Sequence, residues 1–383
     1  MYPDLSYLFH DLFGTAPDNA FSVIKTFGLF LALAFLASAY VLYLEFRRRE
    51  EMGVFKASER VTNYDKNYLY KNTLINALIA FFFGFKLPYI FQNFQNFKVD
   101  PASMVFSGKG VLWTGLILAL GFGLYFFFTE QKSEYFGKTI KESILPSARI
   151  TDITIVAAIS GILGARLFSI FENMEGFLND PIGTLFSGSG LTIYGGLILA
   201  FMVVYWYVHK LGIKPIQVMD AVAPALIVGY GVGRMGCHFS GDGDWGIVNE
   251  LDKPSWFFLP DSFWAYSYPR NVLREGVEIA GCVGNYCREL SPPVFPTPIY
   301  EIFLCGLIFL ILWNLRKRIT VPGVIFFIYL TLNGVERFFI EQIRVNERYD
   351  LMGLNWSLSQ AIAFGFIVIG LVALFILYRR KNN

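Results

Sequence analysis

The sequence predicts an all-α integral membrane protein with about nine transmembrane helices and a small extracytoplasmic head. Two observations support this fold class. First, 55% of the 383 residues are hydrophobic, 18% are aromatic and only 16% are charged, and the mean hydropathy is +0.47. Such a composition is typical of a chain that lies mainly in lipid. Second, nine apolar segments approach the roughly 20 residues that a helix needs to cross a bilayer. They are residues 22–45, 72–92, 111–129, 150–171, 190–209, 217–234, 299–315, 321–343 and 356–378.

The first apolar segment is predicted to be a membrane anchor and not a cleaved signal peptide. Its apolar run is too long for a signal peptide, acidic residues precede it, and no small-residue cleavage site follows. Three consecutive arginines, Arg47, Arg48 and Arg49, end it. We therefore expect the N-terminus to lie outside.

The loop charges agree with this orientation, because short cytoplasmic loops carry the excess of Lys and Arg. With nine spans the C-terminus then lies in the cytoplasm, and we expect a multi-pass protein of the bacterial inner membrane. The net charge of +2 is too small to indicate nucleic-acid binding. The basic residues assigned to the inner side are Arg47, Arg48, Arg49, Lys56, Arg60, Lys66, Lys71, Lys132, Lys138, Lys141, Lys210, Lys214, Arg316, Lys317, Arg318, Arg379, Arg380 and Lys381.

Residues 235–298 form the only sizeable segment outside the predicted spans, and they are rich in Trp, Tyr, Pro and Gly. The aromatic side chains suit either a folded head or a simple belt in the headgroup layer. Cys282 and Cys287 lie in this segment, on the oxidising side. A disulfide fits that location better than a metal site, which needs more ligands than this loop offers. With three histidines in the chain, no metal and no cofactor are expected.

The stretch GYGVGRMGCHFSGDGDWG, residues 229–246, contains the G-x-G-x-x-G spacing of dinucleotide-binding folds. The glycines follow an apolar helix and no βαβ unit surrounds them, so the match is accidental. Glycine amides and Arg234 can together bind a phosphate, such as a phospholipid headgroup, with Asp242 and Asp244 close behind. The alternative is a helix-packing surface with Arg234 extending to the interface.

Ionisable residues inside predicted spans are costly and tend to mark function. The segment ERFFIEQIR places Arg337, Glu341 and Arg344 on one helical face. These residues either form a structural ion pair between Arg337 and Glu341 or converge with Arg234. The others singled out in spans are Arg166, Asp220 and Glu336.

Five motifs in order resemble the bacterial prolipoprotein diacylglyceryl transferases. They are GARLFSIF, YGGLILA, VMDAVAPALIVGYGVGRMG, PTPIYEIF and ERFFIEQIR, the last followed by GLNWSLSQ, and they extend from about residue 150 to the C-terminus. The resemblance implies transfer of the diacylglyceryl group of phosphatidylglycerol to the lipobox cysteine of a prolipoprotein signal peptide, with release of glycerol phosphate. The partners are then these two substrates and membrane lipids. A transporter or scramblase for an anionic lipid or solute is the alternative, which we disfavour because no internal repeat is evident and the polar residues gather at one interface.

Several site residues follow from the resemblance. Arg234 matches the arginine of the family's G-R-x-G motif and is expected to bind phosphate. Arg337 and Glu341 match an arginine and a glutamate near the headgroup site, and both are expected to be catalytic. Arg337, with Arg234, would stabilise the leaving phosphate, and Glu341 would orient Arg337 or accept a hydrogen bond from the headgroup glycerol. The remaining matches are Gly233, Gly236, Gly246, Tyr300 and Glu301. Arg166, Arg344, Cys237, Asp242 and Asp244 complete the expected substrate-binding set.

The departures from the family pattern concern the general base. Tyr194 stands where the family usually has histidine before G-G-L, and Cys237 followed by His238 stands where it has asparagine. Phe27 stands in place of a first-helix tyrosine. A cysteine thiol is only a few per cent ionised at pH 7, so a base would speed its attack. His238 is the preferred candidate and Tyr194 the alternative.

We expect five parts along the chain. Residues 50–149 have no obvious family counterpart and are predicted to add a two-helix insertion to a seven-helix core. The parts are the N-terminal segment with the first helix (1–49), the inserted hairpin (50–149), core helices (150–234), the head (235–298) and C-terminal core helices (299–383).

Overall fold

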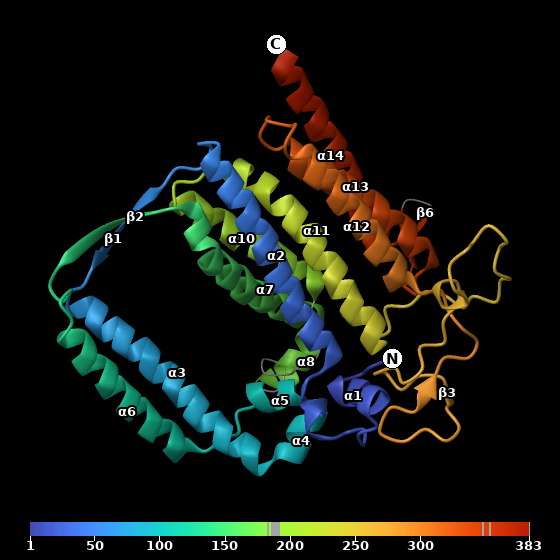
Figure 1. The fold of residues 1–383 in the computed structure, drawn as a ribbon, viewed down its shortest axis with the longest axis horizontal. Helices are drawn as coiled ribbons and strands as arrows, with labels where there is room; N and C mark the ends of the chain where they lie inside the picture. The colour runs from blue at the N-terminus through green and yellow to red at the C-terminus, as the bar shows by residue number, and fades with distance from the viewer. Residues whose placement is uncertain (182–183, 185–191, 347, 352–353, 383) are drawn as a thin grey trace. The chain divides into compact units, whose positions relative to one another are not determined.

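The computed structural model describes residues 1–181, 184, 192–346, 348–351 and 354–382. The chain forms two compact units, which are described separately (Figure 1). The first unit combines residues 1–48 with residues 213–383, and the second consists of residues 49–212.

The first unit is built from four long apolar helices, α2, α11, α12 and α14, and two shorter helices, α1 and α13. Helix α11 packs against α12 and α13, and α13 packs against α14. A buried cluster joins α11, α12 and α13 through residues that include Ile227, Cys305 and Ile325. The bounds are α1 Leu5–Phe13, η1 Ala20–Val23, α2 Thr26–Glu51, α11 Pro215–Ser240, η3 Asp261–Phe263, α12 Thr297–Leu315, α13 Val324–Ile340, η4 Glu341–Ile343, β5 Arg348–Leu351, β6 Leu354–Ser357 and α14 Leu358–Asn382.

Two buried carboxylates connect these helices far from the candidate site. Asp220 of α11 accepts hydrogen bonds from the backbone N–H groups of Gly323 (2.7 Å) and Phe326 (2.9 Å), at the start of α13. Glu45 of α2 pairs with Arg316, which follows α12, at 2.5 Å. Asp220 therefore serves as a helix cap in this structure, and its position in an apolar segment has a structural explanation.

Residues 241–296 form a compact segment with little regular structure, in which β3 Val277–Glu278 pairs with β4 Arg288–Glu289. Its buried cluster consists of Trp245, Tyr268, Leu290 and Val294. The aromatic residues of this segment thus build a core of their own and are more than a surface belt.

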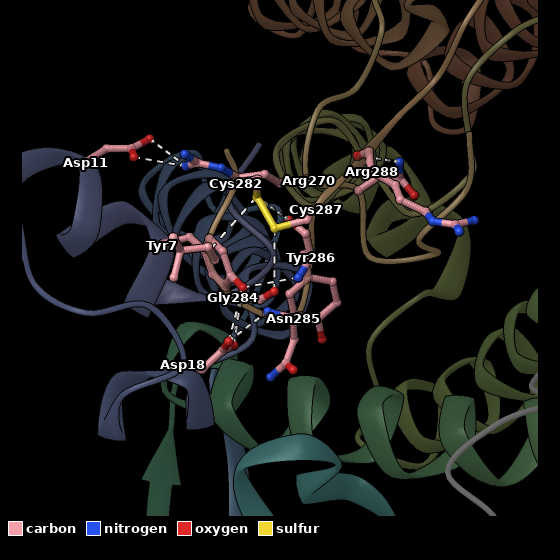
Figure 2. The surroundings of a disulfide bond; sticks show 12 residues. Tyr7, Asp11, Asp18, Arg270, Cys282, Gly284, Asn285, Tyr286, Cys287 and Arg288 are labelled. Carbon is pink, nitrogen blue, oxygen red and sulfur yellow. Dashed lines mark hydrogen bonds and ion pairs between the residues drawn. A yellow bond between two sulfur atoms is a disulfide. The ribbon is translucent and has the colours of Figure 1, made fainter. Parts of the chain in front are cut away.

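The disulfide between Cys282 and Cys287 is formed, and Figure 2 shows its surroundings. It closes a loop whose backbone contacts the N-terminal segment. The N–H of Asn285 donates to the Asp18 carboxylate (2.8 Å), and the N–H of Tyr286 donates to the Tyr7 hydroxyl (3.2 Å). The loop therefore fastens the N-terminal segment to the head.

The second unit contains two helical hairpins. Helix α3 packs against α6, and α7 packs against α10. The antiparallel strands β1 and β2 pair from Ser58 with Ile144 to Asn63 with Thr139. The bounds are β1 Ser58–Asn63, α3 Lys66–Gln92, α4 Phe94–Val99, α5 Pro101–Phe106, α6 Leu112–Gln131, β2 Thr139–Ile144, η2 Pro146–Arg149, α7 Ile150–Glu172, α8 Met174–Asn179 and α10 Ile193–Lys210.

The two hairpins are copies of one another. At an offset of 80 residues, 12 of the 27 residues in 84–110 are identical to those in 164–190, and Lys86 corresponds to Arg166. The residues of the first copy that are identical in the second are Gly84, Leu87, Ile90, Phe91, Asn93, Phe97, Asp100, Pro101, Phe106, Ser107, Gly108 and Gly110.

The elements repeat at the same offset. Helix α3 ends at Gln92 and α7 ends at Glu172; the six-residue helices α4 and α8 then follow. In each hairpin a glycine permits close helix packing. A Cβ atom at Gly84 would lie 2.7 Å from the carbonyl oxygen of Thr114, and one at Gly164 would collide with the carbonyl oxygen of Gly195.

The expectation that the chain has no internal repeat is therefore wrong. Most of the identical positions, such as Asn93, Asp100 and Pro101, lie in the segment that follows the first helix of the hairpin. Four lie in that helix, and of these Leu87 and Phe91 are exposed, as are the residues that match them in α7. The other argument against a transporter, the clustering of charge at helix ends, does not depend on a repeat.

All nine predicted segments overlap helices, but their lengths differ. Among the described residues, seven helices are long and apolar enough to cross a membrane. The described apolar part of α10, Gly195–Lys210, is shorter, and α13 has only 17 residues. The structure is thus that of a mainly helical, multi-pass membrane protein with seven clear candidate spans.

Lys86 is buried within α3 and anchors the loop between α5 and α6. Its ammonium group donates to the carbonyl oxygens of Met104 and Lys109, both at 3.0 Å, and it also contacts the carbonyl of Ser107. An ammonium group has three donors, and these carbonyl oxygens satisfy them. This explains how a lysine is accommodated in an apolar helix.

We predict that Lys86→Met lowers the free energy of unfolding by about 1.5–3 kcal/mol, because hydrogen bonds from a charged donor are lost and the carbonyls stay unsatisfied. Thermal unfolding of the purified protein in detergent measures this. Lys109→Met is the matched control, since that side chain is exposed. Equal unfolding temperatures for the two variants would contradict the anchoring role.

Candidate active site

The largest cluster of buried charge in the first unit centres on Glu301, in the first turns of α12. Its side chain is 0% exposed. The carboxylate lies 3.1 Å from Nε of Arg234, 2.9 Å from Nη1 of Arg337 and 3.6 Å from Nη1 of Arg344. It also accepts a hydrogen bond from the Tyr230 hydroxyl at 2.6 Å. One carboxylate thus collects three guanidinium groups from different parts of the sequence.

Asp244 supplies a second carboxylate, in the loop that follows α11. It forms ion pairs with Arg234 and Arg344. Burial opposes its ionisation, but the two guanidinium groups outweigh this and lower the pKa of Asp244 to about 2. Its side chain is 30% exposed, which makes it the most accessible carboxylate of the cluster.

Glu341 supplies the third carboxylate, at the start of η4. Its Oε2 lies 3.3 Å from Nη2 of Arg337, and its Oε1 accepts hydrogen bonds from the hydroxyl of Ser357 (3.0 Å) and the amide of Asn346. The pair between Arg337 and Glu341 therefore exists, and the same arginine also reaches Glu301. Both expectations for this helical face describe the structure, because the ion pair is part of the convergence.

Three guanidinium groups and three carboxylates balance in charge. Breaking such a buried pair leaves an uncompensated charge and is strongly destabilising. Each guanidinium carries five N–H donors in a planar arrangement that matches phosphate or carboxylate. An anion that replaces the accessible Asp244 would find Arg234 and Arg344 already oriented by Glu301.

Gly233 and Gly236 lie inside a helix and not in a loop. Helix α11 continues to Ser240, so the amides of Gly233 and Gly236 lie within the helix. The observed role is close packing: a Cβ atom at Gly236 would lie 2.9 Å from Cβ of Phe30. At Gly233 an added Cβ would meet no atom of the described residues within 4 Å.

Gly246 positions the loop that carries Asp244. It forms a β-bridge with Arg344, and an added Cβ would lie 2.5 Å from the carbonyl oxygen of Ile343 and 2.8 Å from Cβ of Phe295. A larger residue would separate these segments. Gly246 therefore holds Asp244 within reach of Arg344.

Cys237, Asp242 and Asp244 place one ligand atom each within 4.8 Å of one another, which is close enough to bind a metal ion. Asp244 already pairs with two guanidinium groups, whose charge disfavours a cation there. Burial and the neighbouring Asp244 raise the pKa of Asp242. Cys237 is buried, and its Sγ lies 3.8 Å from Nη1 of Arg234.

His238 is placed among aromatic rings. Its Nδ1 lies 3.4 Å from the Tyr268 hydroxyl, and its ring contacts Tyr266 and Phe239. No hydrogen bond joins it to the arginine–carboxylate cluster among the described residues. The imidazole thus faces the head, one helical turn beyond Arg234.

Two expected site residues belong to the second unit and cannot be placed against this cluster. Arg166 lies on α7 and is half-buried. Tyr194 lies in the first turn of α10, and its side chain is outside the described part of the chain.

Sequence reasoning gave Glu301 too little weight. It was noted only as part of a family motif, although a carboxylate in the first turns of an apolar helix is itself a signal of function. Tyr230 was not singled out at all. A tyrosine in an apolar helix carries no such signal, and only the structure brings it to Glu301.

Comparison with known proteins gives a consistent family. The family model for prolipoprotein diacylglyceryl transferase matches residues 101–376. The phosphatidylglycerol–prolipoprotein diacylglyceryl transferase of Methylococcus capsulatus is 29% identical over 294 residues, covering 74% of this chain and 97% of the relative. Relatives of the same name from Staphylococcus haemolyticus and Xylella fastidiosa are 27% and 28% identical; they cover 74% and 71% of this chain, and 89% and 91% of their own lengths. The matched range includes α6, the second helix of the predicted insertion.

We predict that Asp244→Asn lowers the free energy of unfolding by about 1–2 kcal/mol at neutral pH. Because the folded-state pKa of about 2 lies below the ordinary value of about 3.9, the stabilisation is complete above the ordinary value and is lost as the pH falls toward 2. The difference between the two proteins should therefore persist on acidification to about pH 5 and shrink below it. Asp261→Asn, at a highly exposed ion pair, is the control. Equal effects of the two substitutions would contradict the assignment.

Proposed function

Since this chain belongs to the prolipoprotein diacylglyceryl transferase family, we propose that it transfers the diacylglyceryl group of phosphatidylglycerol to the thiol of a prolipoprotein lipobox cysteine. The product is a thioether, and glycerol phosphate is released. The observation that carries this proposal in the structure is the convergence of Arg234, Arg337 and Arg344 on Glu301, at the ends of apolar helices. Guanidinium groups at helix ends suit a phospholipid headgroup, whose phosphate would replace a carboxylate as their partner.

The reaction breaks a bond between a glyceryl carbon and a phosphate oxygen. The thiolate attacks the carbon, and the phosphate leaves with the bonding electrons. A diester with one negative charge becomes a monoester with two, so charge develops on the phosphate. Arg234 and Arg344 are the proposed phosphate ligands, because Asp244, which now occupies them, is accessible and can be displaced. Glu301 stays behind them and fixes their orientation, so little reorganisation is needed in the transition state.

Arg337 and Glu341 are proposed to hold the other part of the headgroup. Glu341 orients Arg337 at 3.3 Å and can accept a hydrogen bond from the headgroup glycerol. Gly233 is proposed as a substrate contact because the space beside it is open among the described residues. Cys237 and Asp242 lie next to Arg234 and are proposed to complete this side of the site. Arg166, on α7 of the second unit, stays a proposed substrate-binding residue.

The general base is proposed to be His238, with Tyr194 as the alternative. The base takes the thiol proton, and the phosphate monoester or solvent receives it afterwards. In favour of His238 are its position one turn beyond Arg234 and its half-buried ring. Its contact with Tyr268 leaves the second ring nitrogen available for such a role.

We further propose nine spans in the inner membrane of a bacterium, with the N-terminus and the head outside and the C-terminus in the cytoplasm. The loop distribution of Lys and Arg supports this orientation. The five-part division of the chain, with a seven-helix core and a 50–149 insertion, is proposed with it. A cysteine introduced at the exposed Ser255 tests the orientation. A thiol reagent that cannot cross membranes should label it in intact cells; labelling only after lysis would show that the head faces the cytoplasm.

Arg234→Ala should reduce transfer from phosphatidylglycerol to a lipobox peptide by at least about 10²–10³-fold, the usual effect of removing one preorganised donor. Purified protein in vesicles allows this assay. Arg234→Lys keeps the charge but loses the planar pairing, and it should also be impaired. Arg288→Ala, at an exposed pair in the head, is the control. Near-normal turnover by folded Arg234→Ala protein would show that Arg234 does not bind the phosphate and has only a packing role.

His238→Gln should lower turnover by about 10²–10⁴-fold, the usual contribution of a positioned base, and a higher pH should partly restore it by generating thiolate in solution. Tyr194→Phe should cost less and show no such rescue. The pH–rate profiles of both variants measure this. The reverse ranking, with the acidic limb unchanged in His238→Gln, would assign the base to Tyr194.

A further inference from the structure

Glu336 is a buried carboxyl group that the proposed mechanism does not use. It precedes Arg337 on α13, and its side chain is 4% exposed. Neither carboxyl oxygen has a hydrogen-bond partner within the described part of the chain. Burial of a polar group without a partner is costly, and burial of an isolated charge is far more so.

The surroundings of Glu336 contain both signs of charge. Helix α12 contributes acidic Glu301, and α11 contributes cationic Arg234. The charged and titratable groups that face it from the packed elements are Tyr230 and Arg234 on α11, Glu301 and Cys305 on α12, Tyr329 and Arg337 on α13, and Arg344 after η4.

Charge counting assigns a proton to this group. Arg234, Arg337 and Arg344 are already paired with Glu301, Asp244 and Glu341. Asp242 adds to the acidic side. An ionised Glu336 would therefore add a further uncompensated negative charge, whereas a protonated Glu336 adds none.

We propose that Glu336 is a protonated carboxyl group whose charge state controls the affinity of the arginine cluster for the anionic phosphate of the substrate. When Glu336 is neutral, the guanidinium groups attract the phosphate with their full field. When it ionises, it adds a negative charge beside them and weakens binding. Glu336 is thus a positioning group that acts through the arginines. This inference rests on the proposed function, because the anion is taken to be the headgroup of phosphatidylglycerol.

The test is the pH dependence of KM for phosphatidylglycerol in vesicles, with a lipobox peptide as acceptor. In the unmodified protein KM should rise by roughly tenfold on the alkaline side, the size expected for one added charge about 10 Å away in a partly buried site. Glu336→Gln mimics the neutral acid, so its KM should stay at the acid-side value. Glu336→Asp should restore the alkaline rise. Asp242→Asn separates the effect of the other acidic group that could titrate.

Infrared difference spectroscopy supplies a readout that does not depend on turnover. The carbonyl band of a protonated carboxylic acid should be present in the unmodified protein and absent in Glu336→Gln, and it should remain in the exposed control Glu278→Gln. An alkaline rise in KM that persists in Glu336→Gln, or no change in the band, would overturn the inference. Absence of transfer by the unmodified protein at every pH would instead overturn the proposed function.

Discussion

The site depends on one buried carboxylate, Glu301. Three guanidinium groups and a tyrosine hydroxyl surround it, and without it three cations would face one another in a region largely shielded from water. Their mutual repulsion would separate the ends of α11, α12 and α13. Because Glu301 is fully buried whereas Asp244 is partly exposed, the cluster has a fixed inner side and an exchangeable outer side. On the proposed mechanism, Glu301 keeps the arginines in place while the phosphate of the substrate replaces Asp244 as their partner.

The surrounding elements serve to bring these charges together. Asp220 caps α13 from α11, and Gly246 allows the loop after α11 to lie beside Arg344. At the other end of the same helices, Glu45 and Arg316 connect α2 to α12. The ties of Asp220 and Glu45 each use a buried carboxylate, which in an apolar environment favours one arrangement strongly because any other leaves a charge unpaired. Glu336 differs from these carboxylates in that neither of its oxygens has a hydrogen-bond partner among the described residues.

The two hairpins of the second unit share a sequence pattern at an offset of 80 residues. The first copy keeps the turn residues of the second but places Lys86 where the second has Arg166. The Lys86 ammonium group donates its hydrogen bonds to carbonyl oxygens of the residues between α3 and α6. The two hairpins therefore share the residues of the turn, whereas the basic residue in the first helix differs between them.

The sequence by itself determined that the chain is a helical membrane protein, which family it resembles, and which short motifs carry charge, because apolar length and local spacing are written along the chain. It also identified Arg234, Arg337 and Arg344 as candidates, and the structure brings these three side chains to one carboxylate. Tertiary structure decided that Glu301 is the centre, that Gly233 and Gly236 lie inside a helix, and that His238 faces aromatic rings. The contacts that assemble the cluster join residues far apart in the sequence, such as Arg234 with Glu301 and Asp244 with Arg344. The pattern of residues within one segment does not indicate which distant segment will supply the ion-pair partner of a charged side chain.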